Sequence, residues 1–312
     1  MINKAQESIT MNNKKYLAID VGGTAIKYTL IDKNAENYKI NEIETKEEKE
    51  EDLYDSLDKI ILPHLKEIEG IALSFPGLIN VKEGIAHTGG SFKWVNDLPL
   101  KSILEERYSK RIWIENDGKC SALAEFWKGN LSDVENGIVM ALGTGIGGGI
   151  ILNGQLYRGT NGSAGEFSSF ITNFKNQNEP RFSKIGNYKS LINPYAKSKG
   201  IDYNDINGHK FFEDYHKSDE MAIQSLKDYA KIISAGIINT QCVLDVEKFC
   251  IGGGISAQDV LIDEIKEAVH EFFINKTSNP IKEPKIEKCF FRNAAGCIGA
   301  LYNFLNMEKI IE

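Results

Sequence analysis

The chain has 312 residues, a formal net charge of −7 at pH 7, and 42% hydrophobic and 26% charged residues. These values are typical of globular proteins and exclude collagen-like, coiled-coil and wholly disordered chains. The length predicts about two domains. Its 37 Lys and Arg residues form no basic cluster that could neutralise a run of phosphates, so we expect no nucleic-acid partner.

No apolar run reaches the roughly 18 to 20 residues that a membrane-spanning helix needs, so we expect no membrane partner. Residues 1–14 are polar and lack the apolar region of a secretory signal, which predicts a disordered tail and a cytoplasmic protein. Whether translation starts at Met1 or at Met11 stays open. Five cysteines without a CxxC pair indicate reduced thiols.

The first half of the chain alternates strand and helix patterns. Residues 16–32 predict a strand, a glycine turn and a returning strand. The charge run 42–52 is expected to begin an amphipathic helix that continues through Ile61. Further strands are expected at 70–75 and 112–114, and further helices at 104–109 and 122–127. This alternation predicts an α/β sheet.

The second half repeats this opening, because residues 138–157 again predict a strand, a glycine turn and a strand. The stretch 167–193 has few periodic apolar residues and predicts irregular structure or a lid. Later expected elements are helices at 221–243, 260–273 and 294–305, a strand at 247–251 and a glycine turn at 252–254. We therefore divide the chain into an N-terminal α/β lobe at 15–128, a C-terminal α/β lobe at 129–295 and a helix at 296–312 that packs back on the first lobe.

The first glycine turn, Asp20-Val21-Gly22-Gly23-Thr24, has features of a phosphate site. Residues without Cβ allow close approach to the backbone, and successive N–H groups form an anion-binding concavity. Asp20 adds a carboxylate that can hold Mg²⁺ directly or through water. An ordinary glycine hairpin is an equally good interpretation of this turn alone.

The second turn, residues 143–149, contains a literal GxGxxG. A dinucleotide-binding fingerprint requires a helix to begin at the turn, whereas Ile150-Ile151-Leu152 continues as a strand. A Walker A loop is also excluded, because neither turn contains GK[ST]. The remaining interpretation is one phosphate loop in each domain, with the turn at 252–254 providing a surface for adenine or ribose.

These motifs resemble the ordered series of the ROK family of sugar kinases and sugar-responsive repressors. The residues that carry the resemblance extend over nearly the whole expected fold and are DVGGTAIK at 20–27, FPGLIN at 75–80, ENDGKCSALAE at 115–125, GTGIGGGII at 143–151, AGEF at 164–167 and IGGGIS at 251–256. The resemblance implies a two-lobed actin-like ATPase (ribonuclease H-like) fold, with one mixed sheet and flanking helices per lobe. It also implies that ATP and sugar meet in the interdomain cleft, and that the protein is a homodimer.

Carried over residue by residue, the resemblance makes Asp117 the catalytic base that accepts a proton from the attacking sugar hydroxyl. Asn116 would orient sugar hydroxyls, although an Asn-Asp pair after a strand also commonly caps a helix. Glu166 would hold hydroxyls near the anomeric end. Gly77, Gly89 and Gly90 would line the sugar pocket, or serve only as turns. The candidates for binding ATP are Asp20, which also holds Mg²⁺, and Gly22, Gly23, Thr24, Lys27, Gly143, Thr144, Gly145, Gly147, Gly253 and Gly254.

The sequence departs from the family pattern at the zinc site that many members carry. Neither cysteine nor histidine occurs from Glu166 to Gly200, so we expect no structural zinc. Ser169 stands where the family has a histidine beside the sugar. The stretch 180–192 looks more like the zinc-free branch, which includes the β-glucoside kinases. A pocket without that histidine would admit an aglycone, which is a hypothesis.

Three functions remain to be compared. An ATP-dependent kinase acting on the 6-hydroxyl of a hexose or β-glucoside uses every motif above. A family repressor needs a DNA-binding module, for which the fifteen residues before the first expected strand are too few. A protein-binding ATPase of the actin type would have no use for Asn116, Asp117 and Glu166. We therefore expect the kinase, and leave the sugar open among a β-glucoside, glucose, N-acetylmannosamine and other hexoses, with a silent sugar sensor as the alternative.

Overall fold

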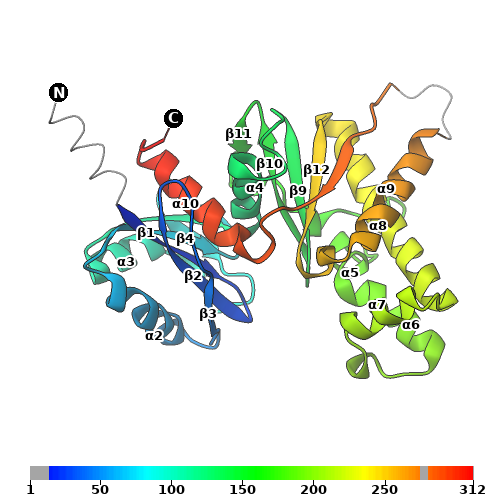
Figure 1. Ribbon diagram of the computed structural model, residues 1–312, viewed down its shortest axis with the longest axis horizontal. Coiled ribbons are helices and arrows are strands. Elements are labelled where there is room, and N and C mark those ends of the chain that lie inside the picture. Colours follow the sequence, from blue (N-terminus) through cyan, green and yellow to red (C-terminus); the bar gives the residue numbers. More distant parts are fainter. Residues whose placement is uncertain (1–13, 275–279, 312) are drawn as a thin grey trace. The chain divides into compact units, whose positions relative to one another are not determined.

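The computed structural model describes residues 14–274 and 280–311 (Figure 1). The predicted tail 1–14 lies almost wholly outside these residues. The described residues divide into two compact units. Unit 1 comprises residues 14–127, 158–164 and 293–311, and unit 2 comprises 128–157, 165–274 and 280–292. The lobe boundaries predicted from the sequence stay a prediction.

Unit 1 is built on a five-stranded mixed sheet. Its strand order is β3-β2-β1-β4-β8, with β1, β2 and β3 antiparallel to one another in turn and β4 and β8 parallel to β1. The strands are β1 (Lys15–Val21), β2 (Ala25–Asp32), β3 (Asn41–Glu44), β4 (Ile68–Phe75) and β8 (Arg111–Asn116). The parallel strands β1, β4 and β8 therefore end at one edge of the sheet, which is where the candidate residues of this unit lie.

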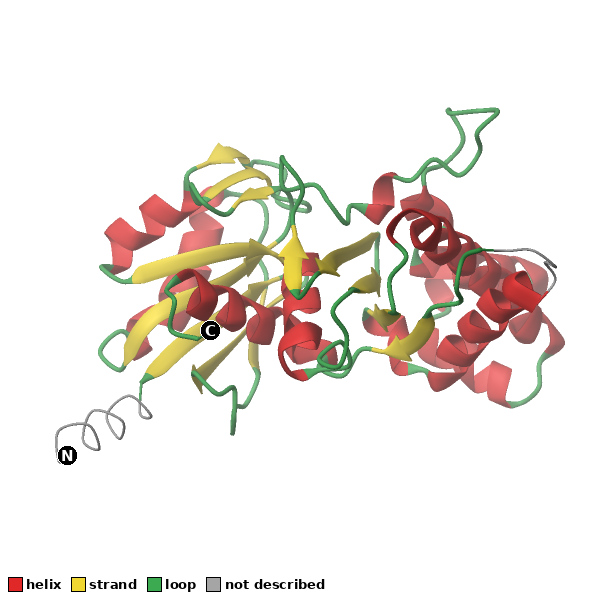
Figure 2. Cartoon of the chain, turned by 90° about the horizontal axis from the view of Figure 1, so that it is seen from above, coloured by secondary structure: helices red, strands yellow, loops and turns green. Residues whose placement is uncertain are grey.

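Helices cover this sheet, and unit 1 also contains a small separate sheet. Figure 2 shows the C-terminal helix α10 crossing the strands of unit 1, where it contacts β1, β4 and β8. The other elements are α2 (Glu50–Ile61), η1 (Leu62–His64), α3 (Leu100–Tyr108), α4 (Asp117–Lys128), η5 (Arg292–Ala294), α10 (Ala295–Met307) and a sheet of β5 (Ile79–Asn80), β6 (Ile85–Thr88) and β7 (Asn96–Leu98). The charge run expected to be helical from residue 42 is helical only from Glu50. Its first residues form β3, because residues 41–44 pair with the edge of β2.

Unit 2 repeats the sheet of unit 1. Its order is β11-β10-β9-β12-β13, with the same pattern of antiparallel and parallel neighbours. The strands are β9 (Gly137–Leu142), β10 (Ile146–Leu152), β11 (Gln155–Tyr157), β12 (Lys248–Gly252) and β13 (Lys285–Lys288). The predicted α/β class and the predicted repetition of strand, glycine turn and strand are confirmed.

The rest of unit 2 is mainly helical. It contains η2 (Phe167–Ser169), α5 (Phe182–Ile185), α6 (Tyr188–Lys199), η3 (Tyr203–Asp205), α7 (Gly208–His216), α8 (Glu220–Leu244), η4 (Gly254–Ala257) and α9 (Asp259–Ile274). The expectation of irregular structure up to residue 193 was wrong from residue 182 onward. Asn187 caps α6 by accepting a hydrogen bond from the Ser190 N–H at 3.1 Å. The apolar face of α6 contains the buried residues Leu191, Ile192 and Tyr195. Such a short apolar face gave too weak a periodicity to be recognised.

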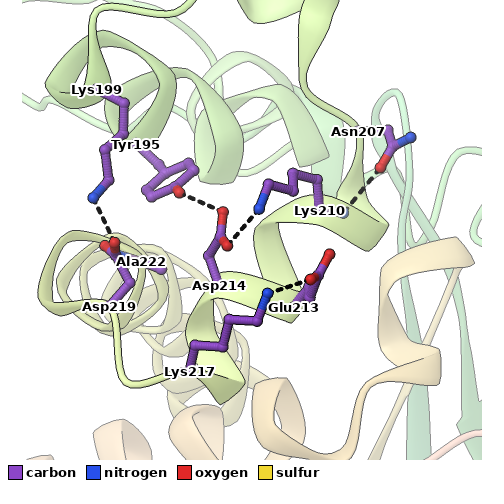
Figure 3. Close-up of polar contacts among 9 residues, drawn as sticks. All are labelled: Tyr195, Lys199, Asn207, Lys210, Glu213, Asp214, Lys217, Asp219 and Ala222. Carbon is purple, nitrogen blue, oxygen red and sulfur yellow. Dashed lines mark hydrogen bonds and ion pairs between the residues drawn. The ribbon is translucent and has the colours of Figure 1, made fainter.

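Polar contacts join α6, α7 and α8 at their exposed surface (Figure 3). Asp214 of α7 accepts hydrogen bonds from Tyr195 Oη at 2.8 Å and from Lys210 Nζ at 2.6 Å. Asp219, the N-cap of α8, pairs with Lys199 at the end of α6. Asp214 thus links α7 to α6, and Asp219 links the start of α8 to α6. In the described residues, no helix has the length and apolar character needed to cross a membrane.

Candidate active site

The carboxyl ends of β1, β4 and β8 bring the acidic candidates of unit 1 to one edge of the sheet. In the parallel register, Asp20 lies opposite Ser74, and Ser74 lies opposite Glu115. Asn116 ends β8, and Asp117 begins α4 directly after it. The sheet thus places Asp20 two strands away from the Asn116–Asp117 pair, within the same unit.

Asp20 has a tightly packed environment. Ser74 Oγ donates a hydrogen bond to Asp20 Oδ1 at 2.6 Å. Burial raises the pKa of the Asp20 carboxyl above its usual range, although the Ser74 hydrogen bond and the charge of Lys27 oppose this shift. A Cβ on Gly296, in α10, would collide with this carboxylate. Gly296 and Ser74 are therefore site residues that sequence reasoning missed.

The first glycine turn is held by a residue that sequence reasoning also missed. Thr45, just after β3, donates from its backbone N–H to Thr24 O at 3.1 Å and from its hydroxyl to Gly22 O at 2.7 Å. Gly23 is exposed, and a Cβ there would lie 2.8 Å from Ser91 Oγ and 3.4 Å from Glu47 Oε2. The turn therefore presents bare backbone whose conformation is fixed from both ends.

Asn116 holds Asp117 by a direct hydrogen bond. Asn116 Nδ2 donates to Asp117 Oδ1 at 2.9 Å and to Gly77 O at 2.8 Å. Asn116 Oδ1 accepts the Lys119 N–H at 3.1 Å, which is the pattern of a helix cap. Asp117 Oδ1 also accepts the Gly118 N–H at 2.8 Å. Asn116 is buried and Asp117 is exposed, so the amide fixes the orientation of a carboxylate that solvent can reach.

The candidate sugar-pocket glycines have structural reasons to be glycine. Gly77 has φ +96°, and a Cβ there would collide with Thr88 O. Gly90 has φ +62°, and a Cβ there would lie 3.1 Å from Pro76. A Cβ on Gly89 would lie 2.7 Å from Phe92 O. These contacts place the turn at 89–90 beside Gly77, whose carbonyl accepts the hydrogen bond from Asn116.

The second glycine turn lies in unit 2 and is shorter than the motif. Gly143 N–H donates to Gly145 O at 2.9 Å, whereas Gly147 already belongs to β10. Ser168, another missed residue, holds the end of the turn, because its Oγ accepts the Ile146 N–H at 2.9 Å and donates to Ile146 O at 3.1 Å. A Cβ on Gly147 would meet no protein atom within 4 Å.

The third glycine turn follows β12 in unit 2. Gly253 has φ +90°, and a Cβ there would collide with Leu142 O, so it packs against the end of β9. A Cβ on Gly254 would meet no protein atom within 4 Å. Packing does not explain why Gly147 and Gly254 lack a side chain. Bare backbone at both positions fits the close approach of a nucleotide.

Glu166 lies at the start of η2, where it is exposed. The segment after it is held by aromatic packing. Phe170 stacks on Phe182 with ring centroids 5.9 Å apart, and it meets Phe167 edge to face at 5.6 Å. Residues 14–274 and 280–311 contain no cluster of three or more His, Cys, Asp or Glu side chains that could hold a metal. The expected absence of structural zinc stays a prediction.

Comparison with known proteins agrees with these motifs and with the fold. The model of the ROK family matches residues 16–306. A β-glucoside kinase of Listeria monocytogenes is 30% identical over 298 residues, which cover 95% of this chain and 99% of that protein. The crystal structure of a ROK family protein from Streptococcus pneumoniae in complex with sucrose is 26% identical, covers 95% of this chain and 100% of that one, and has a TM-score of 0.85.

A ROK family glucokinase from Streptomyces griseus, solved in complex with glucose and AMPPNP, has the same fold. Its TM-score is 0.80 at 21% identity, over 92% of this chain and 98% of that chain. The two α/β units are therefore those of the two-lobed actin-like architecture of sugar kinases. Because the family model matches the ordered motifs from the first strand to the last helix, the chain belongs to the ROK family.

Proposed function

We propose that the protein is an ATP-dependent sugar kinase that transfers the γ-phosphate to the 6-hydroxyl of a hexose or a β-glucoside. The observation that carries this proposal is the Asn116–Asp117 pair, in which an amide donates at 2.9 Å to an exposed carboxylate at the start of α4. Phosphoryl transfer requires little covalent chemistry from the protein beyond a positioned base and donors that hold the phosphates. The family membership and the β-glucoside kinase relative support the same function.

In this proposal Asp117 accepts the proton of the attacking hydroxyl. The hydrogen bonds from the Asn116 amide and the Gly118 N–H hold Asp117 Oδ1 in one orientation. A fixed carboxylate is catalytically effective because its alignment is established before the substrate arrives. Asn116 uses both amide hydrogens on Gly77 and Asp117, so we assign it mainly to orienting the base.

The glycine turns would bind the phosphates and the adenosine of ATP. The turn at 22–24 is braced by Thr45 and the turn at 143–145 by Ser168, while Gly147 and Gly254 leave open space above the backbone. Mg²⁺, when bound, would neutralise charge on the transferring phosphates. Asp20 is suited to hold this ion, because a hydrogen bond from Ser74 fixes its carboxylate and because it lies next to the first turn.

We further propose a β-glucoside as the substrate. The relative named a β-glucoside kinase covers nearly the whole chain, and the ROK family protein solved with sucrose binds a disaccharide. Ser169, which stands where the family pattern has a histidine, is exposed, and so is Glu166. A homodimer, which the family resemblance implies, and a cytoplasmic location complete the proposal.

The decisive measurement is ADP release by the purified chain with Mg-ATP and one sugar at a time. The panel contains cellobiose, gentiobiose, glucose, N-acetylmannosamine, N-acetylglucosamine, fructose and allose. Turnover on the disaccharides supports the β-glucoside assignment, whereas turnover on a single monosaccharide replaces it with a hexokinase or an N-acetylmannosamine kinase. ATP binding without turnover on any sugar would contradict the kinase and favour a sugar sensor.

A further inference from the structure

Arg158 is the first residue of segment 158–164, which belongs to unit 1, whereas the residues directly before and after this segment belong to unit 2. It directly follows β11, and residues 158–164 form a short closed loop within unit 1. Ala164 N–H donates a hydrogen bond to Arg158 O at 3.1 Å. Gly162 has φ +76°, and a Cβ there would lie only 3.0 Å from Ile79 O. The backbone of Arg158 is therefore fixed against unit 1.

The side chain of Arg158 reaches a buried acid. Arg158 Nε donates to Glu115 Oε2 at 2.7 Å, and its Nη2 donates to Asn303 Oδ1, in α10, at 3.0 Å. Glu115 is 1% exposed. Burying a carboxylate is costly unless a cation pairs with it and its oxygens accept hydrogen bonds. The planar guanidinium meets this need while it also holds a second acceptor.

A continuous series of hydrogen bonds leads from Glu115 to Asp117. Glu115 Oε1 accepts the backbone N–H of Asn116 at 2.9 Å, so one carboxylate oxygen serves Arg158 and the other serves Asn116. Among the described residues these are its two hydrogen-bond donors. The Asn116 side chain then donates to Asp117 Oδ1 at 2.9 Å. Three hydrogen bonds thus connect Arg158, through Glu115 and Asn116, to the carboxylate assigned as the base.

We propose that Arg158 is a positioning residue for phosphoryl transfer, which acts through Glu115 to hold the Asn116–Asp117 pair. The inference rests on the proposed function, in which Asp117 is the base. Without the guanidinium, Glu115 keeps a buried charge that no cation pairs with, which favours a turn of the carboxylate toward water. Such a turn alters its hydrogen bond from the Asn116 N–H and therefore the direction of Asp117.

The test uses Arg158→Met, Glu115→Gln and the double variant in the full-length chain. Arg158→Met keeps much of the side-chain stem, and Glu115→Gln keeps the shape and one oxygen acceptor, so the second variant serves if the first fails to fold. Arg107→Met is the matched control, because Arg107 forms an exposed ion pair with Asp58 in the same unit. The readouts are kcat, KM for the sugar, Kd for ATP and the thermal midpoint.

We expect Arg158→Met to lower kcat about 10- to 100-fold, as misplacement of a reacting group does. ATP affinity should stay within about two-fold, because the change affects the base and not the nucleotide turns. The double variant should lose less than the product of the two single losses, since no unpaired charge remains. The Arg107→Met control should match the wild type.

The inference is overturned if Arg158→Met and Glu115→Gln both keep kcat within about two-fold of the wild type. It is also overturned if the loss of rate equals the loss of folded protein. A wild-type chain inactive on every sugar overturns both this inference and the proposed kinase. A wild type that is active, with an inactive Asp117→Asn variant and a fully active Arg158→Met variant, overturns the positioning role alone.

Discussion

The two glycine turns lie on sheets of the same strand order but differ in what surrounds them. In unit 1 the turn at 22–24 follows the half-buried carboxylate of Asp20, and Thr45, just after the edge strand β3, braces it. In unit 2 the turn at 143–145 follows the apolar end of β9, and Ser168 braces it. The first turn thus comes shortly after an acidic residue, whereas the second comes directly after Leu142.

This difference shows how one topology can serve two roles. The repeated strand, turn and strand provides an anion-binding backbone in each unit. The parallel neighbours of the first turn, β4 and β8, add Ser74, Asn116 and Asp117 at the same edge. The corresponding edge of unit 2 adds the bare glycines after β12. We infer that unit 1 holds the groups for proton and metal chemistry, whereas unit 2 mainly binds the nucleotide.

Replacement of the base tests this division most severely. Asp117→Asn removes the proton acceptor, so kcat should fall by about 10²- to 10⁴-fold, while ATP still binds. The matched control is Asp259→Asn, which changes the first residue of α9 in unit 2. Steady-state kinetics and nucleotide titration check both variants. Turnover of Asp117→Asn within a few-fold of the wild type would remove Asp117 from this role.

The packing of Asp20 gives the second test. By helix propensity alone, Gly296→Ala should stabilise α10 by about 1 kcal/mol. The new Cβ would collide with the Asp20 carboxylate, so we expect destabilisation by about 1–3 kcal/mol and a loss of activity. Gly208→Ala is the control, because a Cβ at that helical position meets no atom within 4 Å. Urea unfolding that shows Gly296→Ala to be more stable than the wild type would contradict the contact.

Two neighbouring glycines in unit 2 separate packing from ligand binding. A Cβ on Gly148 would collide with Val139 O and crowd Phe167, so Gly148→Ala should destabilise the protein by about 1–3 kcal/mol. A Cβ on Gly147 meets open space, so Gly147→Ala should leave stability nearly unchanged and weaken ATP binding about tenfold, which is about 1.4 kcal/mol. Calorimetric unfolding and ATP titration of both variants measure this contrast. Unchanged ATP affinity in Gly147→Ala would show that no ligand approaches this backbone.

Local sequence was sufficient to predict β1, β2, β4, β8, β9, β10 and β12, the glycine turns and a helix after Asp117, but not the edge strands β3 and β13 or the small sheet β5–β7. Strand and turn residues act over a few positions, so the pattern at 16–32 predicted β1, the turn and β2. The residues that brace the site were not predictable in this way. Thr45, Ser168 and Gly296 act on Gly22, Ile146 and Asp20, which lie far away in the sequence. Only the folded sheet brings these pairs together.

The segment after Glu166 was difficult to predict for a related reason. Its order depends on the stacking of Phe170 on Phe182 and on the seating of Phe182 against Gly236 of α8. A Cβ on Gly236 would lie 2.5 Å from the Phe182 ring, so the two positions fit each other across many residues of sequence. Irregularly spaced aromatic residues gave no periodic signal.

Acid should loosen the α6–α7–α8 surface of unit 2 before it affects the buried sheets. Hydrogen bonds from Lys210 and Tyr195 lower the pKa of Asp214, and the hydrogen bond from Lys199 lowers the pKa of Asp219. A carboxyl whose pKa is lowered on folding stabilises the protein above its unfolded pKa of about 3.9, and this contribution is lost as the pH falls through the lower folded value. Stability should therefore be level from about pH 5 to 8 and fall below about pH 4.

The measurement for this acid effect is amide hydrogen exchange of α7 at several pH values. Asp214→Asn is the variant, because it removes one titrating carboxyl from the cluster shown in Figure 3. This variant should have a smaller acid-induced change than the wild type. An equal acid-induced change in both proteins would mean that Asp214 does not contribute to it.

The smallest expected effect concerns zinc. Where structural zinc holds a fold, ligand removal by a chelator unfolds it. The segment that carries the zinc ligands in other family members is held here by the packing of the Phe167, Phe170 and Phe182 rings and by backbone hydrogen bonds, such as that from Phe182 N–H to Phe170 O at 3.1 Å. We predict that no metal contributes to the free energy of unfolding, so the thermal midpoint should stay within about 1 °C when a strong zinc chelator is added. A lower midpoint that added zinc restores would show that ligands outside this segment bind a structural metal.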